Sequence, residues 1–213
     1  MCLSMVSPPR IESCLMPVRA LMLVGLLLAA SPVFAADSTN RFALRGVGLA
    51  DCEHFLKALK ERKENVLVVG GWLEGYITAV NQFTPNTFDI APWQSTQVLL
   101  GLVTRNCERN PKAGFFQIVE SMMNFLQPSR LSAQSERVLA EAGGNKFYLY
   151  QDTMKDVQQK LIDLGFLTGG ADGQFGPKTR TALEAYQKAQ KIEVTGLPDQ
   201  NTLFRLLTAQ GGG

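Results

Sequence analysis

The side chains that most often carry catalysis are scarce in this chain. Its 213 residues include one histidine, His54, and four cysteines. A zinc hydrolase takes three or four nitrogen, sulfur or carboxylate ligands, and one histidine cannot supply the usual set. A cysteine nucleophile needs a free thiol beside a histidine, whereas Cys52, near His54, is expected to be oxidised. We therefore expect no catalytic residue, no bound metal and no cofactor.

Carboxylates offer the remaining route to catalysis. Glycoside hydrolysis needs two carboxyl groups across a cleft, and nothing in the sequence pairs Glu53, Glu74 and Asp89. Glu74, close to Trp72, is the best single candidate, although a solvated or capping role is the simpler interpretation. A hydrolase with an active site within residues 40–130 stays open as an alternative.

The charge balance argues against nucleic acid as a partner. The chain has 21 Lys and Arg against 19 Asp and Glu, and its basic residues are scattered. Phosphate binding needs concentrated positive charge.

The first 35 residues have the features of a cleaved export signal. Arg19 precedes an apolar run over residues 20–30, and Val33 and Ala35 are small enough for the −3 and −1 positions of a signal peptidase site. The run is about half the ~20 residues that a spanning helix needs, so no stable membrane span is expected. The mature chain should begin at Ala36 and be periplasmic.

Removal of that signal leaves two cysteines, Cys52 and Cys107. An oxidising compartment favours a disulfide between them. The chain-entropy account gives such a long closed loop ~4 kcal/mol of stabilisation.

Residues 36–127 should form a helical domain, because apolar residues recur at helical spacing. The first helix starts at Asp51, the second covers residues 66–83, and the third runs from about residue 93 to 109, after a loop. Asn110 and Pro111 resemble an N-cap followed by a first-turn proline, which would begin a fourth helix that Pro128 ends. Cys52 and Cys107 then staple the first helix to the third.

Three small residues suggest close helix packing within this domain. Gly71, Gly75 and Ala79 recur every fourth residue of the second helix. This spacing predicts a face against which another helix packs closely. The following residues, 128–149, are rich in Ser, Ala, Gln and Glu, and are expected to be a linker with a weak helix over residues 133–142.

The last part of the chain, residues 150–213, predicts three short helices. Asp152 or Thr153 should cap the first, and Gly165 should end it. Gly176 with Pro177 should open the second, and residues 196–198 the third. A turn followed by a helix occurs twice, because Gly173, Thr179 and Leu183 recur 23 residues later as Gly196, Thr202 and Leu206. The whole chain is thus expected to be all-α, with four helices and then three.

The string Asp172-Gly173-Gln174-Phe175-Gly176-Pro177-Lys178-Thr179, flanked by Val157–Leu161 and by Ala182, Leu183 and Tyr186, resembles the peptidoglycan-binding domain of the PG_binding_1 type that many cell-wall hydrolases carry. The resemblance covers roughly the last quarter of the chain. It implies peptidoglycan as a partner. The candidate binding residues that follow from it are Asp172, Gly173, Phe175, Gly176, Lys178, Thr179 and Arg180.

These residues also suggest how a ligand would be held. Peptidoglycan stem peptides carry carboxylates, and a helix N-terminus at Pro177 favours anions, with Lys178 and Arg180 adding positive charge. Phe175 is in turn expected to be a core residue, as are Leu183 and Tyr186.

The order of Cys52, the segment from Gly71 to Tyr76, Cys107 and Asn110-Pro111 resembles, more weakly, periplasmic helical proteins of the Rap1a-like and acid-stress chaperone types. This resemblance implies protein binding and no catalysis. The sequence therefore indicates a non-catalytic periplasmic protein that is held to peptidoglycan by residues 150–213 and binds another envelope protein through residues 36–127. The alternatives are a wall hydrolase and an adaptor whose C-terminal domain binds protein and not glycan.

Overall fold

The computed structural model describes residue 37, residue 39, and residues 41–62 and 64–208. The predicted signal peptide and its cleavage after Ala35 lie outside these residues. The chain divides into two units, residues 1–40 and residues 41–213. In the described part of the chain, no helix is long and apolar enough to cross a membrane.

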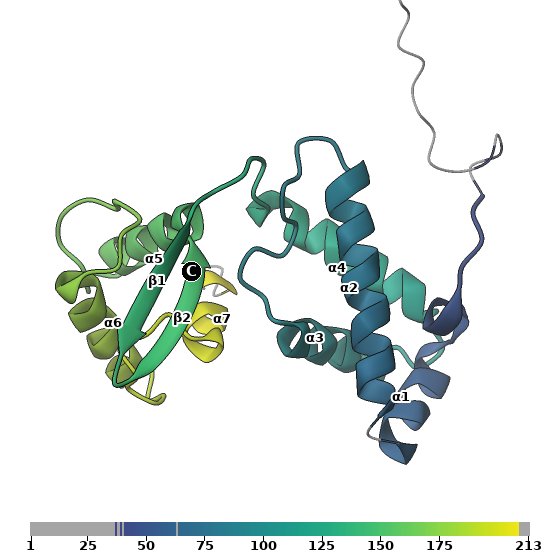
Figure 1. Cartoon of the computed structure of the whole chain (residues 1–213). Helices are drawn as coiled ribbons and strands as arrows, with labels where there is room; N and C mark the ends of the chain where they lie inside the picture. Colours follow the sequence, from purple (N-terminus) through teal and green to yellow (C-terminus); the bar gives the residue numbers. More distant parts are fainter. Residues whose placement is uncertain (1–36, 38, 40, 63, 209–213) are drawn as a thin grey trace, which may run out of the picture. The chain divides into compact units, whose positions relative to one another are not determined.

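Helices dominate the described chain, and one β-hairpin interrupts them (Figure 1). Between residues 41 and 130 the elements are the 3₁₀ helix η1 (Gly46–Leu49), α1 (Cys52–Glu61), α2 (Asn65–Phe83), α3 (Thr96–Arg109), α4 (Phe115–Leu126) and the 3₁₀ helix η2 (Gln127–Ser129). Strands β1 (Arg137–Ala142) and β2 (Asn145–Tyr150) follow, and then α5 (Gln151–Asp163), α6 (Pro177–Ala189) and α7 (Gln200–Thr208). The all-α prediction therefore holds only approximately.

The start of α1 shows why the first helix was predictable. The Asp51 side chain accepts a hydrogen bond from the backbone N–H of His54 at 2.8 Å, which is the N-cap arrangement that aspartate favours. The same hydrogen bond, together with one from the His54 ring, lowers the pKa of Asp51. Cys52 and Phe55 form the buried face of this helix.

The predicted start of the fourth helix is wrong. Asn110 caps the end of α3, and Pro111 lies in the turn that follows. Carbonyl oxygens of this turn, from Pro111 and Ala113, accept the backbone N–H groups of Glu53 and Cys52. The turn therefore serves the free N–H groups at the start of α1, and α4 begins later, after Gly114.

The expectation of close packing at Gly71 and Gly75 is also wrong within this chain. A Cβ atom built at either position would meet nothing within 4 Å. The glycine that does approach another helix is Gly70, whose added Cβ would lie 3.4 Å from Thr96 of α3. One residue is about 100° around a helix, so the contact face of α2 is rotated away from Gly71 and Gly75.

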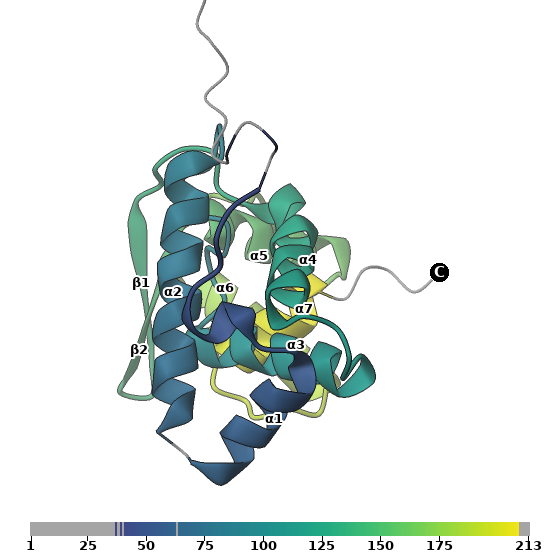
Figure 2. The ribbon, with the colours of Figure 1, turned by 90° about the vertical axis from the view of Figure 1, so that its right-hand side faces the viewer.

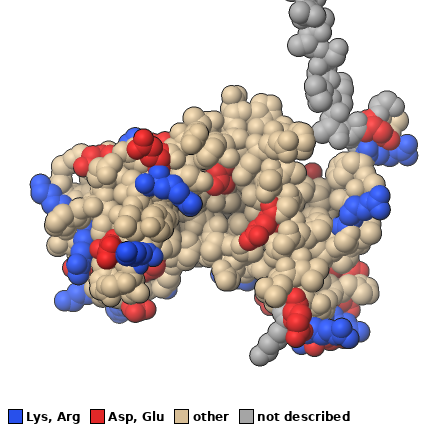
Figure 3. All heavy atoms as spheres, viewed as in Figure 1, with Lys and Arg blue, Asp and Glu red and all other residues tan. Residues whose placement is uncertain are grey.

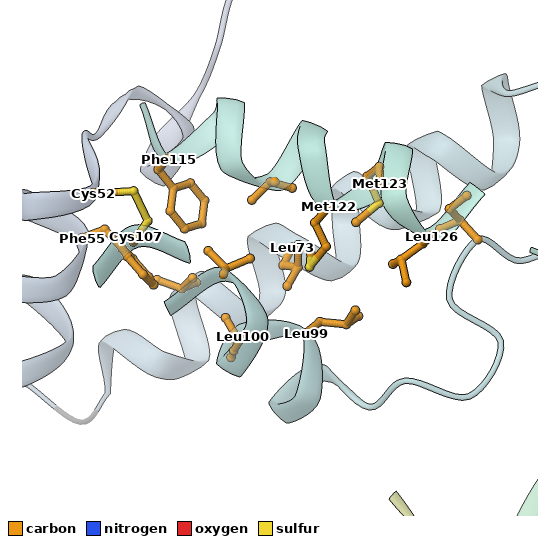
Figure 4. Packing of buried hydrophobic residues seen from close by; sticks show 14 residues of the cluster. Cys52, Phe55, Leu73, Leu99, Leu100, Cys107, Phe115, Met122, Met123 and Leu126 are labelled. Atoms are coloured by element: carbon orange, nitrogen blue, oxygen red, sulfur yellow. A yellow bond between two sulfur atoms is a disulfide. The ribbon is translucent and has the colours of Figure 1, made fainter. Parts of the chain in front are cut away.

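The predicted disulfide is confirmed, because Cys52 and Cys107 are bonded and fully buried. Figure 4 shows the bond at one end of the hydrophobic core, beside the rings of Phe55 and Phe115, which lie 4.7 Å apart. The core continues away from the bond through residues of α2, α3 and α4: Leu73, Leu99, Leu100, Met122, Met123 and Leu126. The bond thus joins the start of α1 to the end of α3, as expected.

The segment that precedes α1 packs between α2 and α4 (Figure 2). The Trp72 ring N–H donates to the carbonyl oxygen of Arg45 at 2.9 Å. Phe42 meets Phe116 edge-on, with ring centroids 5.5 Å apart. Trp72 therefore has a structural role in closing this side of the core.

A hairpin stands where the sequence suggested a weak helix. Strands β1 and β2 pair antiparallel, from Arg137 opposite Tyr150 to Ala142 opposite Asn145. Gly143 and Gly144 form the two-residue turn, with φ of +58° and +79°, as the favoured hairpin turns require. The strands pack on the second core cluster through Ala140, Ala142 and Leu149.

The hairpin also changes how α5 begins. Neither Asp152 nor Thr153 is its N-cap, because the helix starts at Gln151. The hydroxyl of Ser135, which lies before β1, accepts the backbone N–H of Asp152 at 3.1 Å. Ser135, which lies 17 positions earlier in the chain, thus caps a free N–H group at the start of α5.

The loop between α2 and α3 reaches the second core cluster. Trp93 is buried among residues of the C-terminal helices and the hairpin. The Gln200 side chain of α7 holds the loop in place: its Oε1 accepts the backbone N–H of Ser95 at 2.8 Å, and its Nε2 donates to the carbonyl oxygen of Trp93 at 2.5 Å.

Candidate functional site

A buried glutamine organises the loop that contains the Asp172–Thr179 motif. Gln158 of α5 is 2 % exposed. Its Nε2 donates to Asp172 Oδ1, to the carbonyl oxygen of Gln174 and to Thr179 Oγ1, at 2.9, 2.9 and 3.0 Å. Its Oε1 accepts the backbone N–H of Gly173 at 2.7 Å. One side chain therefore ties α5, the loop and α6 together.

A second glutamine repeats this arrangement one unit later. Gln187 of α6 is fully buried, and its Nε2 donates to Thr195, to the carbonyl oxygen of Leu197 and to Thr202, at 2.9–3.0 Å. Its Oε1 accepts the backbone N–H of Gly196 at 2.8 Å. The sequence repeat of Gly173 and Thr179 thus corresponds to a repeated hydrogen-bond network.

This network separates the predicted site residues into two groups. Gly173 and Thr179 are buried and used by the fold, whereas Asp172 is exposed and takes part in the network through its Oδ1. The backbone N–H of Gln174 and then the Gln158 side chain donate to Asp172, and these bonds lower the pKa of its carboxyl group. Thr179 is buried. Gly173 and Thr179 therefore offer no free side-chain group to a ligand, while the hydrogen bonds to Asp172 end on one of its two carboxylate oxygens.

The other predicted residues lie together at the N-terminus of α6. Phe175, Gly176, Pro177 and Arg180 line a shallow hollow of about 420 Å³, whose opposite side is β1. Phe175 is only half-buried, so its replacement cannot be assigned the cost of a fully buried ring.

The two helix N-termini of the repeat differ in a way that bears on anion binding. Asp199 caps α7 by accepting the backbone N–H and the hydroxyl of Thr202, each at 2.9 Å. The equivalent position before α6 is Gly176, which has no side-chain cap. Pro177 has no N–H, so the uncapped donors are those of the next residues, Lys178 and Thr179.

The charges around this N-terminus are exposed. Arg180 forms an ion pair with Glu184, one turn further along α6, at 2.9 Å. Lys178 is exposed, and among the described residues it has no ion-pair partner. The basic character of the site therefore depends mainly on Lys178, because Glu184 offsets the charge of Arg180.

The remaining candidates for chemistry have structural partners. Glu74 accepts a hydrogen bond from the Thr96 hydroxyl, so it links α2 to α3. His54 pairs with Asp51 at 2.7 Å, and Cys52 is in the disulfide. Within the described chain, no group of three or more His, Cys, Asp or Glu side chains is placed to hold a metal ion.

Gln158 and Gln187 are functional residues of the loop network that were not predicted from the sequence. Gln158 lies within the flanking segment Val157–Leu161, and Gln187 directly follows Tyr186, but glutamine on a helix is usually exposed. Each lies on the helix before a Gly–Thr pair, but the two glutamines are 29 residues apart and do not share the 23-residue spacing of those pairs.

Comparison with known proteins agrees with this architecture. Residues 150–206 match the PG_binding_1 family, a peptidoglycan binding domain. The chain is 42 % identical over 58 residues to the N-acetylmuramoyl-L-alanine amidase CwlM of Mycobacterium tuberculosis, a match that covers 27 % of this chain and 14 % of the amidase.

It is also 52 % identical over 42 residues to the type VI secretion system spike protein VgrG3 of Vibrio cholerae, which covers 19 % of this chain and 4 % of the spike protein. The chain thus spans only a small fraction of the length of either relative. No solved structure matches it. Residues 150–206 are a peptidoglycan-binding domain of the PG_binding_1 family.

Proposed function

We propose that this protein is exported, is held at the cell wall by its C-terminal domain, and uses its N-terminal helices to bind another protein of the envelope without catalysing a reaction. The peptidoglycan-binding domain carries the proposal. It accounts for cell-wall association, and the buried disulfide fits an oxidising compartment outside the cytoplasm. The match to the amidase covers only the binding region, so it gives no support to a catalytic role.

The N-terminus of α6 is the proposed contact for wall carboxylates. It combines uncapped N–H groups with the exposed cation of Lys178, and a helix N-terminus favours an anion. Phe175 and Pro177 would supply an apolar surface beside it. The neighbouring residues Asp172, Gly173 and Thr179 would act indirectly, by fixing the loop through Gln158.

Sedimentation with insoluble peptidoglycan tests this site. Replacing Lys178 and Arg180 together with alanine should weaken binding of the mature protein by about tenfold or more, because a hydrogen bond to a charged group contributes about 1.5–3 kcal/mol. Binding by the unaltered protein should also fall as salt is raised, since exposed charges are screened within ~10 Å at 0.1 M.

A matched control removes the same charge elsewhere in this region. Lys146 and Lys188 are exposed, and their double alanine variant should sediment like the unaltered protein. Equal binding by both double variants would rule out the α6 site. Failure of the unaltered protein to sediment would favour the protein-adaptor alternative, and clearing of a peptidoglycan suspension would favour the hydrolase.

Export makes a separate prediction. The protein isolated from the periplasm should have the intact mass of a chain that begins at Ala36, because Val33 and Ala35 fit a signal peptidase site. Recovery of the whole chain in the membrane fraction, with residues 20–30 retained, would contradict it.

The surface of the N-terminal helices supports the protein-partner part of the proposal. Leu67 and Val68 of α2 are 78 % and 67 % exposed, and Gly71 and Gly75 leave open space beside them. Figure 3 shows a largely uncharged area over α2 and α4, whereas charges of both signs are scattered elsewhere on the same face. Exposed apolar surface of this kind is typical of protein-binding faces.

A further inference from the structure

A cavity of about 660 Å³ lies along α5, on the side away from the motif loop. Residues 92–94, the end of α4 with η2, the end of α7 and one face of α5 enclose it. We call it the α5 cavity. About half of its wall comes from residues before 130, outside the part that matches the peptidoglycan-binding family, so it is a feature of this chain and not of the domain alone.

One buried polar atom at this cavity has no partner. Thr153 lines the cavity and is 2 % exposed, yet its hydroxyl oxygen forms no hydrogen bond. Buried hydroxyl groups are normally bonded, because leaving one unpaired costs free energy. The buried threonines of the repeat, Thr179 and Thr202, both have partners. The hydroxyl oxygen itself is closed to solvent, so a ligand in the cavity would bond it only after the Thr153 side chain turns toward the cavity.

Two opposite charges lie on the same helix face. Asp156 and Lys160 line the cavity one turn apart, at a spacing that allows an ion pair, and neither has an ion-pair partner among the described residues. Their neighbour Lys155 is occupied by Asp152 at 2.8 Å. Desolvation by the surrounding protein raises the pKa of Asp156, although its side chain is exposed at the mouth of the cavity, and Asp152 raises it further.

The rest of the wall is mostly apolar. Trp93, Phe125, Leu126 and Leu207 face the α5 side chains across the cavity or flank them. Phe125 is 62 % exposed, which is unusual for a phenylalanine next to a core. A ligand here would meet an anion, a cation and a hydroxyl group from α5 and an apolar surface from the other elements.

We propose that the α5 cavity binds a short zwitterionic peptide. Asp156 pairs with the ammonium group of the peptide, Lys160 pairs with its carboxylate, and the Thr153 side chain turns so that its hydroxyl bonds a peptide group between them. Apolar side chains of the peptide pack on Phe125 and Leu207. Peptides released from the wall and other free peptides share this chemistry, and they differ in that wall peptides carry D-residues.

The test uses the full mature chain and trialanine with free ends, measured by titration calorimetry. Acetylating the N-terminus of trialanine should weaken its binding to the unaltered protein about tenfold, and Asp156→Asn should weaken binding of free trialanine by the same factor. Acetylated trialanine should bind Asp156→Asn no more weakly than either change alone predicts, because both changes remove the same ion pair between Asp156 and the peptide ammonium group. Amidating the C-terminus of trialanine and the variant Lys160→Gln should each weaken binding in the same way, and the two together should weaken it no further, because both remove the pair between Lys160 and the peptide carboxylate.

A control variant and a stability measurement separate ligand binding from a structural role. Glu193→Gln changes an exposed charge of the same domain outside the cavity and should leave peptide binding unchanged. Thr153→Val should reduce trialanine binding severalfold without lowering the melting temperature of the free protein, since the hydroxyl that it removes has no partner there. A lower melting temperature would show instead that water bonds this hydroxyl as part of the fold.

Comparison of all-L and all-D trialanine then identifies the source of the peptide. Tighter binding of the D form would indicate peptides derived from the wall. Absence of binding by either form at 10 mM would overturn the proposal. Equal binding of free and blocked peptides would also overturn it, because Asp156 and Lys160 would then not bind the charged ends of the peptide. Asp156→Asn and Lys160→Gln should still sediment with peptidoglycan, because the proposed function depends on Lys178 at α6. This measurement keeps failure of the peptide site distinct from failure of the proposed function.

Discussion

Replacing Gly173 with alanine should destabilise the C-terminal domain by about 2–5 kcal/mol. The new Cβ would lie 2.6 Å from Cγ and 2.8 Å from the backbone oxygen of Gln151, and φ at Gly173 is +76°. The left-handed backbone costs an alanine roughly 1–2 kcal/mol, and overpacking adds about 1–3 kcal/mol. Moving the loop to relieve the contact would also break the hydrogen bond from Gly173 to Gln158.

Two further glycines provide graded controls, with chemical denaturation followed by circular dichroism as the measurement. Gly170 has an ordinary φ and open space around it, so Gly170→Ala should change the free energy of unfolding by less than about 1 kcal/mol. Gly196→Ala should fall between the two. Its φ is +67°, but its nearest neighbours belong to the Glu184 and Arg180 side chains, which can move. Equal losses for Gly173→Ala and Gly170→Ala would contradict the steric account.

The glycine repeat shows what the sequence could predict. Gly173 and Gly196 mark positions where only a residue without Cβ fits, and Thr179 and Thr202 mark where the next helix meets the core. The reason for the pattern was not visible. Gln158 and Gln187 lie 29 residues apart, while the glycines lie 23 apart, so the glutamines fall outside the repeat until the helices are placed in space.

The hairpin was missed for a different reason. Residues 137–142, Arg-Val-Leu-Ala-Glu-Ala, contain strong helix formers, and their strand conformation depends on pairing with β2 and on packing against α5. Propensity is a weak prior that tertiary contacts override. The Gly143-Gly144 pair between two short segments was the local signal for a hairpin.

Helices α1, α2 and α3 were predicted to within a few residues because caps and periodicity agree there. The start of α4 was not, because Asn110 and Pro111 have the residue types of a helix start while their backbone groups serve the turn and the start of α1. The binding surface is harder still to predict. Whether Lys178 or Asp156 has a partner depends on what other elements bring near it, and sequence spacing does not contain that information.

Removing the disulfide should destabilise the N-terminal helices by about 4 kcal/mol. The bond closes a loop with a sequence separation of 55 residues, and the chain-entropy account assigns that loop ~4 kcal/mol of stabilisation. The variant Cys52→Ala with Cys107→Ala leaves no buried polar atom behind. Domains of this size are stable by about 5–15 kcal/mol in total, so the variant should be partly unfolded at low denaturant concentration.

The two tryptophans make this loss measurable in the right place. Trp72 packs against the core that contains the bond, edge-on to Phe115 with centroids 5.5 Å apart, whereas Trp93 lies in the second cluster. In a Trp93→Phe background, fluorescence therefore reports on the disulfide-bonded core alone. Reductant should shift the denaturation midpoint of that parent toward that of the alanine variant and leave the variant unchanged. Two reactive thiols in the denatured, unreduced protein would contradict the bond. An unchanged denaturation midpoint on reduction would mean that the bond does not restrict the unfolded chain, for instance because that chain is already ordered without it.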